Sequence, residues 1–348
     1  MLKCLADGRI YAADGEQNRR DDLCYLVRKV VRIDSNGRID YHIDSDGEVV
    51  RVVSNGVVLT EKPIVEFIGE NESLFQGILN SKGRAFSLPD TDAFLRSIGV
   101  ESLKSPSSEK IDITLEIFEP QINSNVEQGF SIKSKLKAPA TLINASRQTN
   151  FEFRLPGLAD GLASEVDSIL SGGGRNRYTD AFNLLRENNI PLIFDGMCSE
   201  TYEDNLMMVF PNAPKIAAEM VRIWFCDRIS DMDQIAERMN TTNPVGLRDP
   251  ASRPFYKNMI QEILVKHALG LKPGSPWSGE EDANGGYIIV KMNGDILCYH
   301  IYERNDFKEY LFRNTHMDTA KQDRNDFGRL YKKGGNWFVK LNLQVRFC

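Results

Sequence analysis

The sequence predicts a mixed α and β fold, in which strand-rich regions at both ends flank a helical centre. Short β-branched runs fill the first third, and helical periodicity follows the flexible joint Ser171–Gly174. Strand patterns then return near residue 286. We therefore expect a β-rich region at 1–105, a core at 106–172, a helical region at 173–285 and a mixed α/β element at 286–348.

The first region contains four short runs rich in β-branched residues: Leu26–Ile33, Ile39–Ile43, Val49–Val53 and Val57–Leu59. Asn-Gly or Asp-Gly dipeptides at 36–37, 46–47 and 55–56 punctuate these runs, and such dipeptides favour tight hairpin turns. Pro63–Ile68 and the helical-looking Thr91–Ile98 follow, and Ser102–Glu109 reads as a polar connector.

The core region begins with a half-buried strand. Apolar residues alternate with polar ones from Ile111 to Ile117, which is the period-two pattern of a strand with one buried face. The polar turn Gln121–Gln128 leads into a second strand, Gly129–Lys133, and Phe151–Leu155 is a third. These strands carry the residues of greatest chemical interest.

Hydrophobic periodicity also predicts the remaining helices and strands. Helices are expected at Tyr178–Asn188, Thr201–Phe210, Pro214–Ile229 and Pro254–Leu269. Strands are expected at Tyr287–Lys291, Ile296–Tyr302 and Trp337–Phe347, with a helix at Asp306–Arg313. The Ile223–Phe225 cluster is interpreted as core, and His267, within an apolar helical pattern, as structural.

Composition indicates a globular protein of the cytoplasm. The chain is 41% hydrophobic and 26% charged, with no run near the ~20 apolar residues that span a bilayer. Charged residues come too early for a signal peptide. The six cysteines lie far apart without a Cys-x-x-Cys pair, which favours reduced thiols over a zinc site or a disulfide framework.

The net charge of −6 conceals two basic segments. Residues 131–154 hold five basic residues and one acidic residue, and residues 304–346 hold ten basic residues and five acidic ones. Clustered Lys and Arg are what DNA phosphates require. Charge alone leaves two interpretations open: an acidic protein that binds DNA on one face, or one with two solvated basic stretches.

An acid and a lysine in the core region suggest hydrolysis of a phosphodiester. Glu119 ends the first core strand, and Lys133 ends the second. Magnesium prefers oxygen ligands and needs only one or two carboxylates. A lysine beside it helps to orient the attacking water and neutralises developing charge. The same pattern also arises at a solvated sheet edge.

Several blocks of sequence resemble the HpaII-type restriction endonucleases. They are Gly129–Ser134, Thr141–Ser146 and Thr149–Phe151 in the centre, Leu5–Asp14 early in the chain, and Ile296–Tyr302 and Lys340–Phe347 near its end. The resemblance implies a PD-(D/E)XK nuclease core, dependence on Mg2+ and cleavage of both strands of duplex DNA by a homodimer. A short GC-containing site, CCGG if the family's namesake is followed, is the expected target.

Carried over by position, the resemblance assigns catalytic roles within the core. Glu119 stands for the metal-binding acid and Lys133 for the motif lysine. Ser131 occupies the slot of the second carboxylate and is expected to reach the metal through its hydroxyl or a bridging water. Gln128 or Glu127 is the alternative for that slot, and Glu116 is the alternative first acid.

The resemblance also concerns the start of the chain. Family members usually carry a helix with glycine and glutamate ahead of the segment that opens this chain, and Met1–Lys3 starts inside that segment. Two explanations are open: a shortened relative, or a sequence from which that piece is left out. If that helix supplies a catalytic glutamate in other members, the activity of this chain is in question.

Polar residues after the second core strand are the candidate DNA contacts. They are Lys135, Lys137, Asn144, Ser146, Arg147, Gln148, Thr149 and Asn150. The two lysines suit phosphates, whereas the others suit phosphates or base edges. The alternative is a polar loop that satisfies its own backbone.

The expected function is therefore a type II restriction endonuclease. A structure-specific or repair nuclease with the same core is one alternative, and a catalytically impaired DNA-binding module is another. Cleavage of unmodified duplex at fixed positions distinguishes the first alternative. DNA binding in Ca2+ without cleavage in Mg2+ distinguishes the second.

Overall fold

The structure is a computed structural model, and it describes residues 1–34, 37–81, 87–100, 111–136 and 139–348. The chain forms two compact units. Unit 1 contains Met1–Ala140, Ala268–Gly270 and Glu281–Phe307, and unit 2 contains Thr141–His267, Leu271–Glu280 and Lys308–Cys348. The predicted connector at 102–109, Asn36 and Lys137 lie outside the described residues.

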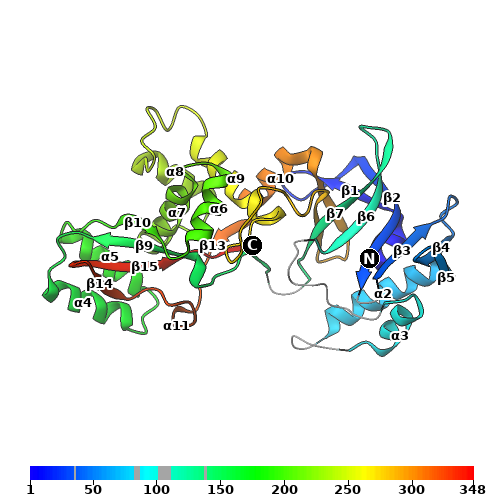
Figure 1. Cartoon of the computed structure of the whole chain (residues 1–348), viewed down its shortest axis with the longest axis horizontal. Helices are drawn as coiled ribbons and strands as arrows, with labels where there is room; N and C mark the ends of the chain where they lie inside the picture. Colours follow the sequence, from blue (N-terminus) through cyan, green and yellow to red (C-terminus); the bar gives the residue numbers. More distant parts are fainter. Residues whose placement is uncertain (35–36, 82–86, 101–110, 137–138) are drawn as a thin grey trace. The chain divides into compact units, whose positions relative to one another are not determined.

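Unit 1 is built around one nine-stranded sheet (Figure 1). Its strands are β1 (Arg9–Ala13), β2 (Arg19–Asp34), β3 (Gly37–Ile43), β4 (Val49–Ser54), β5 (Val57–Pro63), β6 (Ile113–Glu119), β7 (Ser124–Ser134), β11 (Gly286–Val290) and β12 (Ile296–His300). The helices are α1 (Leu2–Asp7), α2 (Ile64–Asn80) and α3 (Pro89–Ser97), with the 3-10 turn η2 (Ile301–Glu303).

The order of the strands partly closes this sheet into a ring. The order is β1-β12-β11-β7-β6-β2-β3-β4-β5, and β1 also pairs with β2. The strands β2, β6 and β7 are successive antiparallel neighbours, whereas β11 runs parallel to β7. This arrangement places β7 between β6 and β11, so both of its edges are paired.

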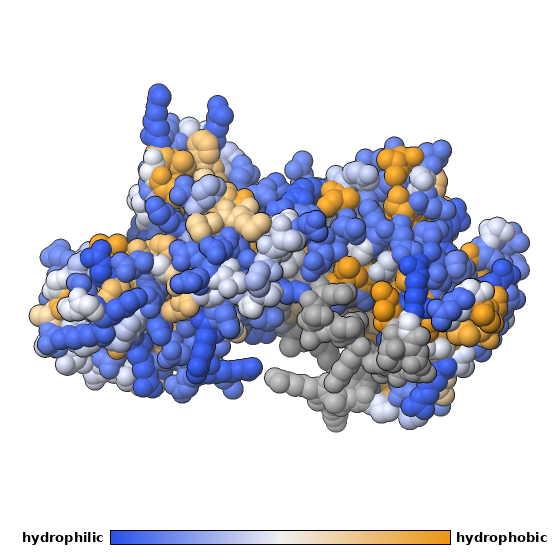
Figure 2. All heavy atoms as spheres, viewed as in Figure 1, coloured by the Kyte–Doolittle hydropathy of each residue, from blue (hydrophilic) through white to orange (hydrophobic). Residues whose placement is uncertain are grey.

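The core of unit 1 lies on the face of the sheet that α1 and α2 cover. Leu2, Leu5 and Phe67 from these helices pack into the same buried cluster as Leu115 and Phe130. Strand β6 alternates strictly between buried and half-exposed residues, as its sequence predicts. At the far edge of the sheet, β5 leaves the apolar side chains of Val57, Val58 and Leu59 exposed. Figure 2 shows that hydrophobic residues, in orange, also reach the surface of unit 1.

Unit 2 contains two smaller sheets and most of the helices. The four-stranded sheet has the order β10-β9-β15-β14, and the three-stranded one has the order β13-β16-β8. Their strands are β8 (Thr141–Ile143), β9 (Asn150–Leu155), β10 (Ile193–Met197), β13 (Thr315–Met317), β14 (Leu330–Lys333), β15 (Asn336–Asn342) and β16 (Val345–Phe347).

The helical elements follow the predicted positions closely, with additions. They are η1 (Arg147–Thr149), α4 (Asp160–Ser171), α5 (Arg177–Glu187), α6 (Glu200–Val209), α7 (Ala213–Asp227), α8 (Met232–Thr242), α9 (Phe255–Leu269), α10 (Arg304–Arg313) and α11 (Gln322–Asn325). Within α7, Ile223, Trp224 and Phe225 are buried, which confirms their interpretation as core. No described helix is long and apolar enough to cross a membrane.

The boundary between the units falls inside the predicted core region 106–172. Residues up to Ala140, with Lys133, belong to unit 1, whereas Thr141 and the polar loop after it belong to unit 2. The candidate catalytic strands and most of the candidate DNA contacts therefore have to be described separately.

Candidate active site

The hairpin of β6 and β7 determines which of the candidate residues meet. Its strands are antiparallel, with Ile113 opposite Phe130 and Glu119 opposite Ser124. Lys133 lies nine residues beyond Ser124 on β7, which is roughly 30 Å along a strand. In an antiparallel pair, the end of the first strand adjoins the start of the second, not its end. The structure therefore does not bring Glu119 and Lys133 together.

The residue that does lie beside the motif strand is Asp112, at the other end of the hairpin. Its Oδ2 accepts hydrogen bonds from the Ser131 hydroxyl at 3.1 Å and from the Ile132 backbone N–H at 2.7 Å. Its own backbone N–H donates to the Phe130 carbonyl at 2.9 Å. The Asp112 carboxylate is thereby fixed against the Ser131–Lys133 stretch.

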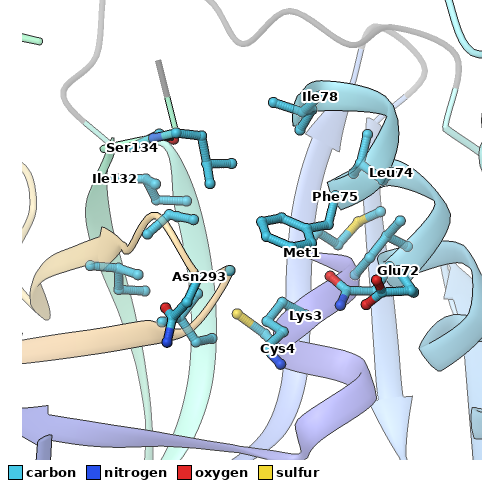
Figure 3. A pocket seen from close by; sticks show the side chains of 17 residues that line it. Met1, Lys3, Cys4, Glu72, Leu74, Phe75, Ile78, Ile132, Ser134 and Asn293 are labelled. Carbon is cyan, nitrogen blue, oxygen red and sulfur yellow. Dashed lines mark hydrogen bonds between the residues drawn. The ribbon is translucent and has the colours of Figure 1, made fainter. Parts of the chain in front are cut away.

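The side-chain directions on β7 place Lys133 and Ser131 on one face. Ile132 and Ser134 line an apolar cavity of about 310 Å³ opposite α1 and α2. Figure 3 shows both residues across this cavity from Leu74 and Phe75. Since alternate residues of a strand point to opposite faces, Ser131 and Lys133 lie on the other side. We call Asp112, Ser131 and Lys133 the Lys133 group.

The donor set of the Lys133 group fits magnesium. Asp112 is an exposed carboxylate, and the Ser131 hydroxyl is within hydrogen-bond distance of it. Among the described residues, no cluster of three or more His, Cys, Asp or Glu could enclose a metal ion. A single carboxylate with a hydroxyl suits Mg2+, which retains several waters, better than metals that demand an all-protein cage.

The alternative acids Glu116 and Glu127 are committed to ion pairs elsewhere. The Lys29 ammonium lies 2.9 Å from Glu116 and 3.0 Å from Glu127. Arg38 binds both carboxylate oxygens of Glu127, at 2.9 and 2.6 Å, and holds the pKa of that carboxyl down to about 2. Glu127 precedes Ser131 by four residues, about 13 Å along the strand. Neither acid adjoins Lys133.

Glu119 and Gln128 belong instead to a buried cluster with His300. The His300 Nε2 lies 2.8 Å from the Gln128 Oε1, and its Nδ1 lies 3.4 Å from the Glu119 Oε2. Both Glu119 and His300 are fully enclosed. Burial raises the pKa of Glu119 and lowers the pKa of His300 to about 4. Within this Glu119 cluster (Glu119, Gln128 and His300), Glu119 and His300 are thus shielded from a DNA substrate, whereas Gln128 is half-buried.

The candidate DNA contacts divide into fixed and exposed residues. The Thr149 Oγ1 accepts a hydrogen bond from the Ser146 backbone N–H and donates one to the Ser146 carbonyl, both at 3.0 Å. Asn150 is 1% exposed, and its amide donates to the carbonyls of Asn325 at 2.8 Å and Asp326 at 3.1 Å. The Thr149 hydroxyl and the Asn150 amide therefore satisfy backbone groups of the protein itself.

The exposed members of the same set lie in unit 2. Asn144, Arg147 and Gln148 are exposed in unit 2, and the last two line a hollow of about 220 Å³ with Lys340. In unit 1, the backbone N–H of Lys135 donates to the Val290 carbonyl at 2.8 Å, which extends the pairing of β7 with β11 by one residue. Lys137 lies outside the described residues.

The prediction missed Asp112 although the sequence contains a signal for it. Asp112 directly precedes the first alternating strand, and Ser131–Lys133 closes the second. Because a short turn makes such strands antiparallel, the start of one lies beside the end of the other. This rule selects Asp112 rather than Glu119 as the acid of the hairpin that lies beside the Ser131–Lys133 stretch.

Comparison with known proteins gives a family for the whole chain. The family described as HpaII restriction endonuclease matches residues 1–347. The type II restriction enzyme HpaII of Haemophilus parainfluenzae is 32% identical over 348 residues, which make up 100% of this chain and 95% of that protein. No solved structure matches.

Proposed function

The chain belongs to the HpaII restriction endonuclease family and is a type II site-specific deoxyribonuclease, and we propose that the Lys133 group is its active site. In this proposal the enzyme hydrolyses both strands of duplex DNA with the help of Mg2+. The observation that carries it is the pair of hydrogen bonds that hold the Asp112 carboxylate against Ser131 and Ile132.

The arrangement supports a PD-(D/E)XK core with an altered second position. Asp112 stands as the first acid, and Ser131-Ile132-Lys133 stands where the motif has a carboxylate, any residue and lysine. The serine supplies a neutral ligand in place of a charged one. The site therefore has a single carboxylate with which to hold the metal, and Asp112 carries that role.

Each residue of the group has a distinct role in the proposed reaction. Asp112 and the Ser131 hydroxyl would hold Mg2+, which when bound stabilises charge on the phosphoryl oxygens and lowers the pKa of water. The Lys133 ammonium donates hydrogen bonds that orient the attacking water and neutralise the negative charge that develops on the phosphate. Ser131, which is 1% exposed, also keeps Asp112 in place.

Two copies of the chain suit a duplex with two strands. A homodimer with two-fold symmetry would present one Lys133 group to each antiparallel strand. The expected particle has twice the 39.4 kDa mass of one chain, which sedimentation equilibrium measures directly. A monomeric mass under cleaving conditions with DNA bound would contradict this part of the proposal.

The experiment that tests the activity is a digest of plasmid DNA of known sequence. With Mg2+, all fragment ends should map to one short GC-containing sequence, for which CCGG is the first candidate. Ends scattered over the plasmid, or confined to flaps and mismatches, would support a structure-specific nuclease instead. Binding in Ca2+ without any cleavage in Mg2+ would indicate an impaired DNA-binding relative.

A further inference from the structure

A hollow in unit 2 collects basic side chains that the proposed active site does not use. It has a volume of about 500 Å³ and is lined by Ser171, Arg177, Lys321, Gln322, Asp323, Arg324 and Arg329. Four of these side chains are basic and one is acidic. Figure 2 shows strongly hydrophilic side chains around α11, which contributes three of the lining residues. We call it the α11 hollow.

Two of the four cations already have partners within the protein. The Arg177 guanidinium donates to the Gly172 carbonyl at 3.0 Å and to the Tyr178 hydroxyl at 3.2 Å. Arg329 lies 3.6 Å from Asp323, but both side chains are mostly exposed. Such a surface pair contributes little to stability.

The other two cations are not neutralised by the protein. Within the described ranges, Lys321 and Arg324 have no carboxylate within ion-pair distance. Both are exposed and lie three residues apart at the same hollow. Their positive charge is therefore directed to solvent or to a ligand.

The scaffold beneath these two cations is fixed by hydrogen bonds. The Asn325 amide donates to the Lys321 carbonyl at 2.9 Å, and Asn150 holds the carbonyls of Asn325 and Asp326. The Tyr178 hydroxyl donates to Gln322 at 3.2 Å. Asn150 directly follows η1, which carries the exposed Arg147, so α11 is attached to the candidate DNA loop.

We propose that the α11 hollow is a phosphate-binding subsite for the DNA backbone, in which Lys321 and Arg324 each contact a phosphate. The inference rests on the proposed action on duplex DNA and adds a contact surface on unit 2. A phosphodiester is the matching ligand because it is anionic and offers several acceptor oxygens to ammonium and guanidinium donors. Phosphate contacts position the duplex and do not depend on base sequence.

The test compares two double variants that remove the same charge. Lys321→Ala/Arg324→Ala removes the two cations without partners. Lys332→Ala/Lys333→Ala is the matched control, because Lys332 is paired with Asp160 at 2.7 Å and Lys333 with Glu152 at 2.9 Å. Fluorescence anisotropy with labelled duplexes, with and without the cleavage site, gives the affinity at several salt concentrations. Ca2+ replaces Mg2+ so that no cleavage occurs.

The expected result is a smaller salt dependence in the hollow variant alone. Each lost phosphate contact reduces the log–log salt slope by about 0.9, so two contacts reduce it by roughly 2. Affinity should fall by the same factor on both duplexes, and thermal unfolding should be unchanged. An unchanged slope, or an equal reduction in the control, would overturn the subsite.

The same experiment separates this inference from the proposed active site. The two proposals have different readouts: Lys133→Ala is measured by cleavage in Mg2+, whereas Lys321→Ala/Arg324→Ala is measured by the salt slope of binding in Ca2+. Cleavage by Lys133→Ala would refute the proposed active site without affecting the proposal for the α11 hollow. If the wild-type protein binds neither duplex, both the phosphate subsite and the proposed action on DNA are refuted.

Discussion

At the residue scale, two clusters with similar residue types have opposite environments. The Lys133 group lies at an end of the β6–β7 hairpin with an exposed carboxylate, whereas Glu119 and His300 of the Glu119 cluster are enclosed. The charges of the Lys133 group can therefore act on a ligand. In the second, burial disfavours the charged forms of both Glu119 and His300.

Lys133→Ala should lose at least about 100-fold in cleavage rate, because the ammonium that stabilises the developing charge is removed. Lys3→Ala is a suitable control, since Lys3 belongs to the same unit and pairs with Asp7 at 3.1 Å. Single-turnover cleavage in Mg2+ and duplex binding in Ca2+ should show intact binding with lost chemistry. Near-normal turnover in Lys133→Ala would exclude the role assigned to this lysine.

The buried imidazole of His300 should make the fold sensitive to acid. The pKa of His300 in the folded protein is about 4, below the ordinary value of 6.5. The stability that the neutral imidazole contributes is therefore present above pH 6.5 and is lost as the pH falls toward 4. The loss in the free energy of unfolding reaches up to about 3 kcal/mol. The raised pKa of Glu119 acts in the opposite sense, because its penalty fades as the pH falls.

Urea unfolding between pH 7 and pH 4 checks this expectation. His300→Gln should be less stable than wild type at pH 7 but should lose less stability on acidification. Identical pH profiles for His300→Gln and wild type would contradict the neutral, buried state of the imidazole.

At the scale of elements, sequence periodicity predicted most of the strands and helices near the site. The alternation from Ile111 predicted β6, and the apolar run at 287–291 predicted β11, within one or two residues. The predicted closing strand Trp337–Phe347 is two strands in two sheets, β15 and β16. Hydrophobic pattern alone does not report such a break.

The start of β11, where Gly286 pairs with His300 at the end of β12, provides a test of the strand pairing beside β7. Gly286 has φ +117°, and a Cβ there would come within 2.1 Å of the Tyr299 carbonyl oxygen. Gly286→Ala should therefore destabilise the protein by at least about 1–3 kcal/mol. Gly69→Ala in α2 is the control, since nothing lies within 4 Å of its added Cβ and alanine favours the helix.

Chemical denaturation measures both glycine variants. Gly286→Ala should unfold at lower denaturant concentration and, by disturbing the pairing of Tyr287 with Ser131, should also slow cleavage. Gly69→Ala should be as stable as wild type or more so. A Gly286→Ala variant with wild-type stability would show that β11 does not depend on this backbone conformation.

At the scale of the whole molecule, the sequence indicated the family and the basic segments, but not how the residues are divided between units. The resemblance at both ends and in the centre is confirmed by the match over residues 1–347. The assignment of Glu119 depended on which strand ends meet, and that is set by pairing direction. The enclosure of Glu119 depends on His300, which is distant in the chain.

The division into units also limits what a local sequence pattern can assign. Arg147 and Gln148 follow the motif lysine closely in the sequence, yet they belong to unit 2 with α11. Thr149 and Asn150, of the same residue types as DNA contacts, are buried in hydrogen bonds with Asn342. A polar residue's role here depends on partners nearly two hundred residues away.

The most direct test of the central claim compares two isosteric variants at opposite ends of the β6–β7 hairpin. Asp112→Asn keeps an acceptor for the Ile132 N–H but removes the charge that would hold Mg2+. Glu119→Gln removes a charge that burial already disfavours. In single-turnover cleavage with Mg2+, Asp112→Asn should be at least about 100-fold slower than wild type, and Glu119→Gln should remain within a few-fold of it. Loss of cleavage in a folded Glu119→Gln variant, with near-normal cleavage in Asp112→Asn, would contradict the account.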